Sequence, residues 1–398
     1  MHSQYMTKSV LVAGGGVAGT VTAIALQRAG WQPRLFESRA EGESDERGAF
    51  LTVAVNGLTA LRALGLDPGR VLAAGFATPT VAMTNGAGKR LAVLPLGGPT
   101  ADGTVTTTIR RADLYRALRA VAAERGIPIE YGKRLDAYAE GAGGVTATFT
   151  DGTTAEGDLL VGADGLRSRT REVLNPDGPA PTYLGLLNAG GFTDHPVEAD
   201  LDRTPGVMHM AFGREAFFGW TMAPDGRVWW FANPPSKRPV RSGDFTPASW
   251  RAHLIDLFQG DDLPAAAIIR ATDAAIGPWN TDDLRRVPVW HSDRVVLAGD
   301  AAHAVAPSSG QGASMAMEDA AVLGRCLATH PEVPAALAAY ERIRRPRVEK
   351  VVAVGRRNGS GKTAGPLAAA LRDALLPTIL KLAYRRGNPQ AWILDHQV

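Results

Sequence analysis

The amino-terminal segment holds a strand, a glycine-rich turn, a helix and a second strand in immediate succession. The apolar run from Ser9 to Ala13 predicts a buried strand, and Val17 to Ala29 predicts a helix that ends at Gly30. Pro33 to Phe36 predicts the next strand. This order constrains the fold more than any other feature, because it is the order of a parallel βαβ unit.

The turn between strand and helix reads Gly14-Gly15-Gly16-Val17-Ala18-Gly19 and has the spacing of a dinucleotide fingerprint. Gly14 permits the tight turn, Gly16 lets a pyrophosphate approach the backbone, and Gly19 lets the helix pack on the strand. Glu37 follows the second strand at the spacing where a carboxylate accepts hydrogen bonds from a ribose. The alternative is a glycine-rich turn in an ordinary βαβ unit.

A second glycine-rich stretch lies near the carboxyl-terminal third. The strand from Val295 to Ala298 stops at Gly299-Asp300, the turn Ser308-Ser309-Gly310-Gln311-Gly312 follows, and a helix of small residues begins. A carboxylate and bare backbone N–H groups at a helix start suit a polyhydroxylated, anionic cofactor.

A third strand also ends in an Asp-Gly pair. Asp158 to Ala163 predicts a buried strand, Asp164-Gly165 follows it, and Arg167, Arg169 and Arg171 come immediately after. A carboxylate at the carboxyl end of a strand lies where open α/β sheets bind ligands. Asp164 as the cap of a helix is the alternative.

Two arginines are candidates for contact with an anionic cofactor. Arg47 lies in a charged, glycine-bearing loop, and Arg111 opens a predicted helix. The alternatives are a solvated Arg47 and a surface ion pair of Arg111 with Asp113 or Glu124.

The segment from Val207 to Phe231 is strand-like and unusually aromatic. Pro224-Asp225-Gly226-Arg227 predicts a hairpin turn. With Asp225-Gly226 as a two-residue loop, Thr221 faces Trp230 and Ala223 faces Val228 on one side of the sheet. Met222 then faces Trp229 on the other side. Alternation does not say which side covers a ligand, and sheet core is the alternative for either.

Composition excludes several classes of protein. The 398 residues are 45% apolar and 21% charged, which fits a soluble globular chain, and the net charge of +3 is not clustered into a basic stripe that would bind nucleic acid. A single cysteine, Cys326, fits the reducing cytoplasm. Leu367 to Leu382 is too short to span a membrane, and we expect this helix to pack on its own domain rather than on a membrane surface. No cluster has metal-ligand spacing.

A hydrolase reading of His303 with Ser308 and Ser309 lacks the Gly-x-Ser-x-Gly elbow. No second dinucleotide fingerprint follows a strand, so we expect any nicotinamide cofactor to dock transiently in a surface groove.

The fingerprint with Glu37, the stretch from Asp158 to Arg171 and the stretch from Gly299 to Asp319, in this order, resemble the flavin motifs of the single-component FAD-dependent aromatic hydroxylases. The likeness is to the p-hydroxybenzoate hydroxylase family, in its shorter salicylate hydroxylase and tetracycline-modifying type. The run from Tyr340 to Arg347 is similar to the carboxyl-terminal helix of that family. The resemblance covers nearly the whole chain.

The resemblance implies an α/β fold. A Rossmann-like FAD-binding domain of the glutathione reductase type is interleaved with a mostly antiparallel β-sheet substrate domain and followed by carboxyl-terminal helices. The implied boundaries assign residues 1–75, 101–178 and 285–335 to the FAD-binding domain. Residues 76–100 and 179–284 form the substrate domain, and residues 336–398 form the helical segment.

Site residues carry over by position in the motifs. The cofactor residues so implied are Gly14, Gly16, Val17, Ala18, Gly19, Glu37, Arg47, Arg111, Asp164, Asp300, Pro307, Gly310, Gly312 and Ala313. Glu37 is expected at the adenosine ribose, Asp300 at the ribityl or pyrophosphate portion, and Pro307 with the Gly310 to Ala313 backbone at the isoalloxazine ring. The residues implied for the substrate are Met210, Thr221, Val228 and Trp230.

The implied activity is that of an FAD-dependent monooxygenase. It uses NADPH or NADH as a transient co-substrate and O₂ to hydroxylate or epoxidise an aromatic or polyketide-like molecule through a flavin 4a-hydroperoxide. The resemblance favours the sheet face of Thr221, Ala223, Val228 and Trp230 for the substrate. This face carries no Arg, Lys or His, which predicts a mostly neutral substrate. A monomer or homodimer is expected. The alternatives are a flavin reductase, dehydrogenase or halogenase of the same superfamily, and a flavin- or drug-binding protein without turnover.

Overall fold

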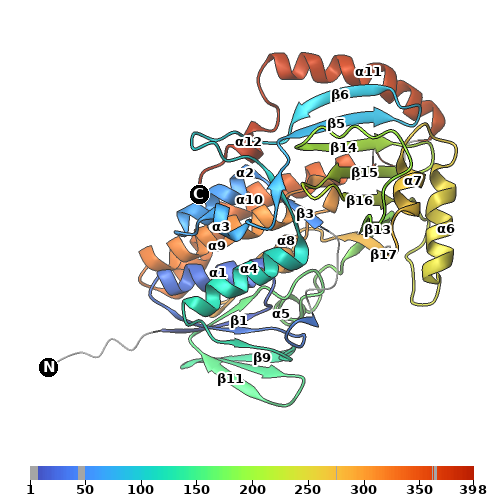
Figure 1. The fold of residues 1–398 in the computed structure, drawn as a ribbon. Helices are drawn as coiled ribbons and strands as arrows, with labels where there is room; N and C mark the ends of the chain where they lie inside the picture. The colour runs from blue at the N-terminus through green and yellow to red at the C-terminus, as the bar shows by residue number, and fades with distance from the viewer. Residues whose placement is uncertain (1–7, 44–49, 275, 361, 363–364) are drawn as a thin grey trace.

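The computed structural model describes residues 8–43, 50–274, 276–360, 362 and 365–398. A parallel sheet lies at one end, and a larger, mostly antiparallel sheet at the other, with long helices between them (Figure 1). Arg47 lies outside the described residues, so its predicted role stays a prediction.

The parallel sheet has five strands in the order β18-β12-β1-β2-β8. They are β1 (Ser9–Ala13), β2 (Gln32–Phe36), β8 (Ile129–Glu130), β12 (Leu159–Gly162) and β18 (Val295–Leu297). Because each neighbouring pair is parallel, all five carboxyl ends lie at one edge. The glycine and Asp-Gly motifs that follow β1, β12 and β18 therefore lie side by side.

Apolar side chains cover both faces of this sheet, as expected for buried parallel strands. Val10 and Val12 pack under the helices, whereas Leu11 and Ala13 pack on a second, three-stranded sheet. The helices are α1 (Val17–Arg28), α2 (Val55–Ala63), α4 (Arg111–Glu124), α9 (Gly312–Thr329) and α10 (Val333–Ser360). The three-stranded sheet is β9 (Leu135–Gly141), β10 (Gly144–Phe149) and β11 (Thr154–Gly157).

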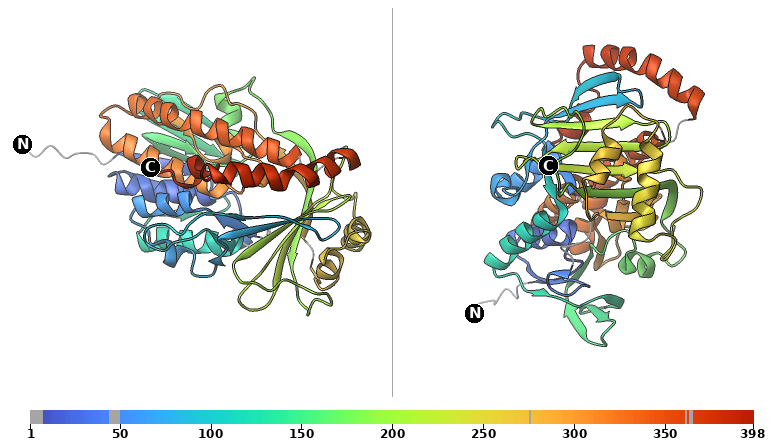
Figure 2. Two further views of the ribbon diagram at one scale, coloured as in Figure 1. Left: turned by 90° about the horizontal axis from the view of Figure 1, so that it is seen from above. Right: turned by 45° about the vertical axis from the view of Figure 1, so that its right-hand side comes forward.

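The large sheet has seven strands in the order β17-β13-β16-β15-β14-β5-β6, antiparallel except where β14 meets β5. The strands are β5 (Thr80–Asn85), β6 (Arg90–Pro95), β13 (Thr182–Phe192), β14 (Val207–Phe212), β15 (Phe217–Met222), β16 (Val228–Asn233) and β17 (Ile276–Asp283). Helices α6 (Pro247–Phe258) and α7 (Ala265–Arg270) cover one face of it (Figure 2). Thr246 caps α6 in a capping box with Ser249.

The predicted register of the aromatic hairpin is wrong. Met222 pairs with Val228 and Thr221 with Trp229, one residue away from the expected pairing. The loop has three residues, since Ala223 N–H donates to Arg227 O at 2.9 Å and Gly226 has a φ of +83°. A two-residue loop would need an N–H from position 224, and proline has none. Thr221 therefore shares a face with Trp229, while Val228 and Trp230 occupy the opposite face.

A small sheet connects the two halves. It consists of β3 (Phe50–Val53), β7 (Thr107–Arg110) and β4 (Phe76–Ala77) in the order β3-β7-β4. The remaining helices are α3 (Pro68–Val71), α5 (Arg169–Leu174), α8 (Asp300–His303), the 3₁₀ turn η2 (Pro307–Ser309), α11 (Pro366–Arg385) and α12 (Ala391–Leu394).

Helix α11 lies on β6 at the outer edge of the large sheet, so it packs on the protein itself, as expected (Figure 1). It nevertheless leaves Leu367, Leu371 and Ile379 exposed, at 88%, 61% and 56%. Among the described residues, none of the helices combines the length and the apolar content that crossing a bilayer demands. The predicted α/β class, with a parallel sheet, a mixed sheet and carboxyl-terminal helices, is confirmed.

Candidate active site

The three glycine-bearing motifs meet at the carboxyl edge of the parallel sheet. A Cβ atom placed on Gly14 would lie 2.3 Å from the carbonyl oxygen of Ala163, and one on Gly299 would lie 2.6 Å from the Cβ of Ala18. Such distances are far below van der Waals contact, so the motifs touch one another through bare backbone. Gly14 and Gly299 also have positive φ angles, 108° and 61°.

The fingerprint turn leaves the start of α1 open to an anion. No side chain caps α1, and its first turn carries no acidic residue. The first N–H groups of a helix have no partner within it, and together with the helix dipole they favour negative charge. A Cβ on Gly16 would meet only the Tyr115 hydroxyl, at 3.8 Å, so the backbone there stays accessible. Val17, Ala18 and Gly19 form this first turn.

Glu37 is held at the end of β2 by backbone groups. Its Oε2 accepts from Gly15 N at 2.9 Å, and its Oε1 accepts from Arg39 N at 2.9 Å. Arg119 donates from Nε and Nη2 to the carbonyl of Gly15, at 3.1 and 3.0 Å, and lies 3.8 Å from Glu37. Sequence reasoning missed Arg119, although its spacing of eight residues from Arg111 places both on one face of α4.

Arg111 and Asp300 face each other across the motif edge. Arg111 Nε donates to the Tyr115 hydroxyl at 2.6 Å, and the charges of Tyr115 and Asp300 both raise the pKa of Arg111. The Asp300 side chain opens to solvent, yet the surrounding protein removes much of its hydration and raises its pKa, against the opposing effect of His303 and Arg111. The surface ion pair between Arg111 and Asp113 is not formed; Asp113 pairs with Arg116.

Asp164 accepts hydrogen bonds from residues at the start of α5. Its Oδ2 accepts from the backbone and the hydroxyl of Thr170, both at 3.0 Å, and its Oδ1 accepts from Ser168 Oγ. The alternative of Asp164 as the N-cap of this helix is therefore wrong: Ser168 is the N-cap residue, and Asp164 accepts from an N–H of the first turn. Beside it, Leu166 and Arg167 border a hollow of about 510 Å³ that Arg241, Trp279 and Asp282 close from the other side.

Pro307 opens η2, and Gly310 ends it with a φ of 62°. Helix α9 then begins at Gly312 and Ala313 without a side-chain cap and without an acid in its first turn. We call the segment from Pro307 to Ala313 the flavin loop, after the role that the family resemblance predicts for it. The start of α9 lies next to that of α1, because a Cβ on Gly299 would lie 2.6 Å from Ala18 of α1 and 3.6 Å from Ala316 of α9.

A buried charge network lies beneath the flavin loop. Arg344 donates to Asp319 Oδ1 at 2.7 Å and to Glu318 Oε2 at 2.6 Å, and Arg347 donates to both oxygens of Glu318 at 2.7 Å. His303 Nε2 lies 2.5 Å from Asp319 Oδ2, which also accepts from Gly299 N at 2.9 Å. Arg344, Glu318 and Asp319 are fully buried, so sequence reasoning, which saw only a charged amphipathic helix, missed their role.

The face of the large sheet opposite α6 and α7 is aromatic. We call Phe192, Phe217, Trp229 and Phe231 the aromatic face. Phe50 of β3 packs against it, with its ring 5.7 Å from Trp229 and 6.0 Å from Phe231 between centroids. The buried indole N–H of Trp229 has no hydrogen-bond partner among the described residues.

A cation lies at each end of the aromatic face. Arg110 lies 4.4 Å from the Phe192 ring centroid and 5.4 Å from that of Trp229. Lys362 lies 4.1 Å from the Phe217 centroid and 5.7 Å from that of Phe231. Sequence reasoning missed both, because they come from β7 and from the segment after α10 rather than from the sheet. The prediction of a mostly neutral substrate counted only the side chains of the sheet itself, and these two cations from outside the sheet lie over its rings.

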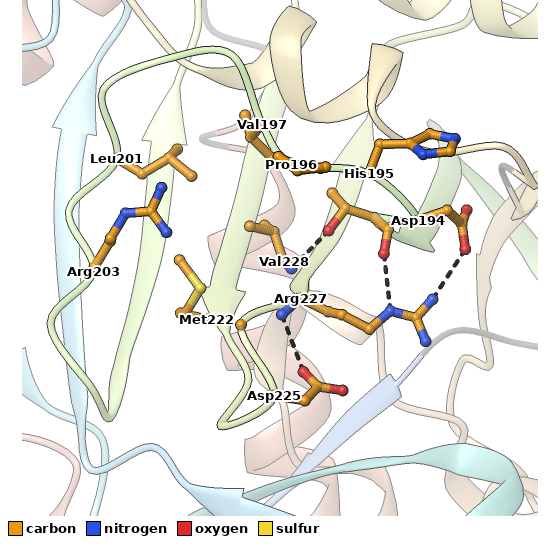
Figure 3. A pocket seen from close by; sticks show the side chains of 12 residues that line it. Asp194, His195, Pro196, Val197, Leu201, Arg203, Met222, Asp225, Arg227 and Val228 are labelled. Atoms are coloured by element: carbon orange, nitrogen blue, oxygen red, sulfur yellow. Dashed lines mark hydrogen bonds and ion pairs between the residues drawn. The ribbon is translucent and has the colours of Figure 1, made fainter.

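The predicted substrate residues divide between the two faces of the sheet. Met210 and Thr221 lie on the side of the aromatic face, since Met210 pairs with Gly219 in the register that pairs Met208 with Thr221. Trp230 is fully buried against α6 and α7 and donates from Nε1 to Thr272 Oγ1 at 2.9 Å. Val228 borders a pocket of about 330 Å³ near the hairpin turn, where Arg227 is bonded to Thr193 and Asp194 (Figure 3).

The aromatic face and the motif edge are joined by two short links. Strand β3 carries Phe50 at one end, and at the other end Ala54 N donates to Ser314 Oγ, in the first turn of α9, at 3.1 Å. Arg110 and Arg111 are consecutive, one over the aromatic rings and the other facing Asp300. The residues present thus fit FAD: two open helix starts, the cradle of glycines, and an acid at the end of β2.

Comparisons with known proteins agree with this geometry. The family model described as FAD binding domain matches residues 7–354. The aurachin C monooxygenase/isomerase of Stigmatella aurantiaca is 34% identical over 92% of this chain and 93% of its own length. The FAD-dependent urate hydroxylase of Klebsiella pneumoniae is 31% identical over 87% and 88%.

The solved structure of Klebsiella pneumoniae HpxO complexed with FAD and uric acid superposes with a TM-score of 0.82. The two are 26% identical, and the match covers 94% of this chain and 95% of that one. The family resemblance read from the three motifs is confirmed. The chain belongs to the family of FAD-dependent monooxygenases.

Proposed function

We propose that this monooxygenase oxygenates a flat aromatic small molecule held against the aromatic face. The observation that carries the proposal is the joining of that face to the motif edge through β3 and through the Arg110-Arg111 pair. Stacked and edge-to-face rings give a planar substrate large contact area and a defined orientation. The named activities of the relatives, on aurachin C and on urate, support the same class of substrate.

The chain's own residues would bind and orient FAD. The first turn of α1 would hold the pyrophosphate, Glu37 the adenosine ribose, and Asp300 with Arg111 the central portion. The backbone of the flavin loop would border the isoalloxazine ring. Bound FAD supplies the transfer of electrons from NAD(P)H and the activation of O₂, while the protein positions the substrate and excludes water.

We assign the docking of NAD(P)H to the hollow beside Asp164. It is bounded by Arg167 and Arg241, whose guanidinium groups suit the phosphates of a dinucleotide. Arg167 is close enough to Asp282 to oppose the rise that burial causes in the pKa of that carboxyl. Replacing Arg167 with Gln is expected to raise the KM for NAD(P)H several-fold and to leave substrate affinity unchanged.

The test is a screen of aromatic compounds with the FAD-loaded protein. Turnover requires NAD(P)H oxidation that an aromatic compound stimulates, together with a product that has gained one oxygen atom by mass. Gly14→Val, which forces a side chain into the Ala163 carbonyl, is the control that should lose FAD and activity together. Stimulated oxidation without any oxygenated product would favour the reductase alternative, and flavin binding without any oxidation would favour a binding protein.

A further inference from the structure

Helix α10 passes the flavin loop, and Lys362, two residues after the end of this helix, lies at the aromatic face. A Cβ on Gly355 would lie 3.3 Å from Ser309, and one on Gly359 would lie 3.1 Å from Ser308 Oγ, so the helix approaches η2 closely through glycines. Arg356 fixes this approach from the other side, because its Nη2 donates to the buried carboxylate of Asp283 at 2.8 Å. Lys362 therefore lies between the flavin loop and the sheet.

Among the described residues, the groups in contact with the partly buried ammonium of Lys362 are neutral. Nζ donates to Asn233 Oδ1 at 2.6 Å, and the Asn233 amide in turn donates to Asn188 Oδ1 at 2.8 Å. Asn188 then donates to Thr281 Oγ1 at 2.6 Å. Each amide is held by the next, which keeps the Asn233 oxygen turned toward Nζ. No carboxylate among the described residues forms an ion pair with it.

One neutral acceptor and two aromatic rings offset only part of the cost of taking an ammonium out of water. A buried charge ordinarily has an opposite charge beside it, as Arg344 and Asp283 do in this protein. The rings of Phe217 and Phe231 favour a cation over their faces, with a contribution of about 0.5–2 kcal/mol. The described residues place no anion beside Lys362. A ligand bound in front of the aromatic face can supply that anion.

We propose that Lys362 binds an anionic oxygen of the aromatic substrate, the oxygen of a phenolate, an enolate or a carboxylate. The inference rests on the proposed function and adds the chemical class of the substrate. With a phenol or enol, the O–H bond breaks, the proton goes to neutral Nζ, and an ammonium–oxyanion pair remains. No electron changes hands in this step. A carboxylate pairs directly with the protonated amine.

Burial lowers the pKa of Lys362 from 10.5 to about 7, which is consistent with this assignment. Near neutral pH the amine is present in both forms, so it accepts a proton from a phenol or pairs with an anion that is already formed. Arg110, at the other end of the aromatic face, is the further cation that faces the bound substrate. Its positive charge adds to the preference for an anion.

The binding test uses matched pairs of probes with the FAD-loaded full chain. The pairs are 2-naphthol with its methyl ether and 2-naphthoate with 2-naphthamide, titrated by the change in flavin absorbance. The acidic member of each pair should bind about tenfold to a hundredfold more tightly, as a charge-assisted hydrogen bond provides. Lys362→Met should remove that preference, Lys362→Arg should keep part of it, and Lys381→Met, on the exposed surface of α11, should keep all of it.

The preference should also depend on pH in a way that a structural role would not produce. Naphthol should lose affinity for the native protein as the pH falls below the pKa of Lys362, because a protonated amine no longer accepts its proton. Equal binding of acidic and neutral members, or a preference that survives in Lys362→Met, would overturn the inference. So would a failure of both acidic probes to bind when a neutral aromatic binds.

A measurement without substrate separates this inference from the proposed function. Reductive ¹³C-methylation of the lysines, with Lys362→Arg to assign the signal, gives the pKa of the amine by NMR. A value near 7 is expected, and a value near 10.5 would sink the assignment whatever the screen shows. If the value is near 7 but no aromatic stimulates NAD(P)H oxidation, the proposed function fails.

Discussion

Two groups of charged side chains lie near the proposed site, and they are built differently: one is buried and the other is partly buried over aromatic rings. In the buried charge network, Glu318 and Asp319 meet Arg344, Arg347 and His303 with every carboxylate oxygen bonded. At the aromatic face, Lys362 and Arg110 lie over rings, and the described part of the chain gives them no carboxylate.

The difference separates scaffold from site. Charges that are fully paired within the protein hold a shape and have no capacity left for a ligand. Asp319 shows this directly, because it bonds to Gly299 N and so fixes the turn that presents Asp300. Cations without a paired anion keep that capacity. A charged side chain should therefore stabilise the fold when it belongs to the buried charge network and destabilise the fold when it lies at the aromatic face.

The largest effect is expected for Arg344→Met. It removes the counter-charge that the buried Asp319 and Glu318 share and should lower the free energy of unfolding by about 3–5 kcal/mol. Denaturant unfolding measures it, and Arg342→Met, two residues away on the exposed side, should stay within about 0.5 kcal/mol of the parent. If the two variants had the same free energy of unfolding, the buried charge network would not stabilise the fold in the way that we propose.

Lys362→Met should act in the opposite direction. The folded protein releases this proton near pH 7 and the unfolded chain only near 10.5, so the lysine destabilises the fold most at and below neutral pH. Stability of the parent should rise relative to the variant between these values, by up to roughly 5 kcal/mol, because one pH unit is worth about 1.4 kcal/mol. Parallel pH profiles of parent and variant would remove the contrast between the two groups.

Acid should affect the network through Asp319. Burial alone would raise its pKa, but His303 and Arg344 outweigh it and lower the pKa from 3.8 to about 2. A carboxyl with a depressed pKa stabilises the fold above 3.8, and that contribution, roughly 2 kcal/mol, is lost as the pH falls through 3.8 to about 2. Asp319→Asn should therefore show a shallower loss of stability than the parent over that range. An unchanged slope would assign acid unfolding to other groups.

Features set by neighbouring residues could be predicted from the sequence. The buried strands, the glycine turns and the order of the three motifs followed from short-range pattern, and the parallel pairing brought the motifs together. The hairpin register failed on one local detail, the missing N–H of Pro224. Arg119 could also have been predicted from the sequence, since it continues the four-residue spacing of Arg111 and Tyr115 along α4.

The position of Arg344 and Lys362 could not be predicted in the same way. Whether a charged residue on a helix meets solvent, a buried carboxylate or an aromatic ring depends on what the tertiary fold sets opposite it. Arg344 is buried because Asp319 lies across from it on α9. Lys362 reaches Phe217 only because α10 passes the flavin loop closely at Gly355 and Gly359.

The smallest predicted effect compares two consecutive tryptophans that the corrected register places on opposite faces. Trp229→Phe and Trp230→Phe remove the same atoms, so most of the loss of packing cancels between them. Trp230 also loses its hydrogen bond to Thr272 and leaves that hydroxyl buried, so its variant should be less stable by about 1 kcal/mol. The Trp229 N–H has no partner to lose among the described residues, and its variant should instead bind the acidic naphthalene probes several-fold more weakly. If instead Trp229→Phe were the less stable variant and Trp230→Phe the weaker binder, the substrate would meet the Trp230 face of the sheet and not the aromatic face.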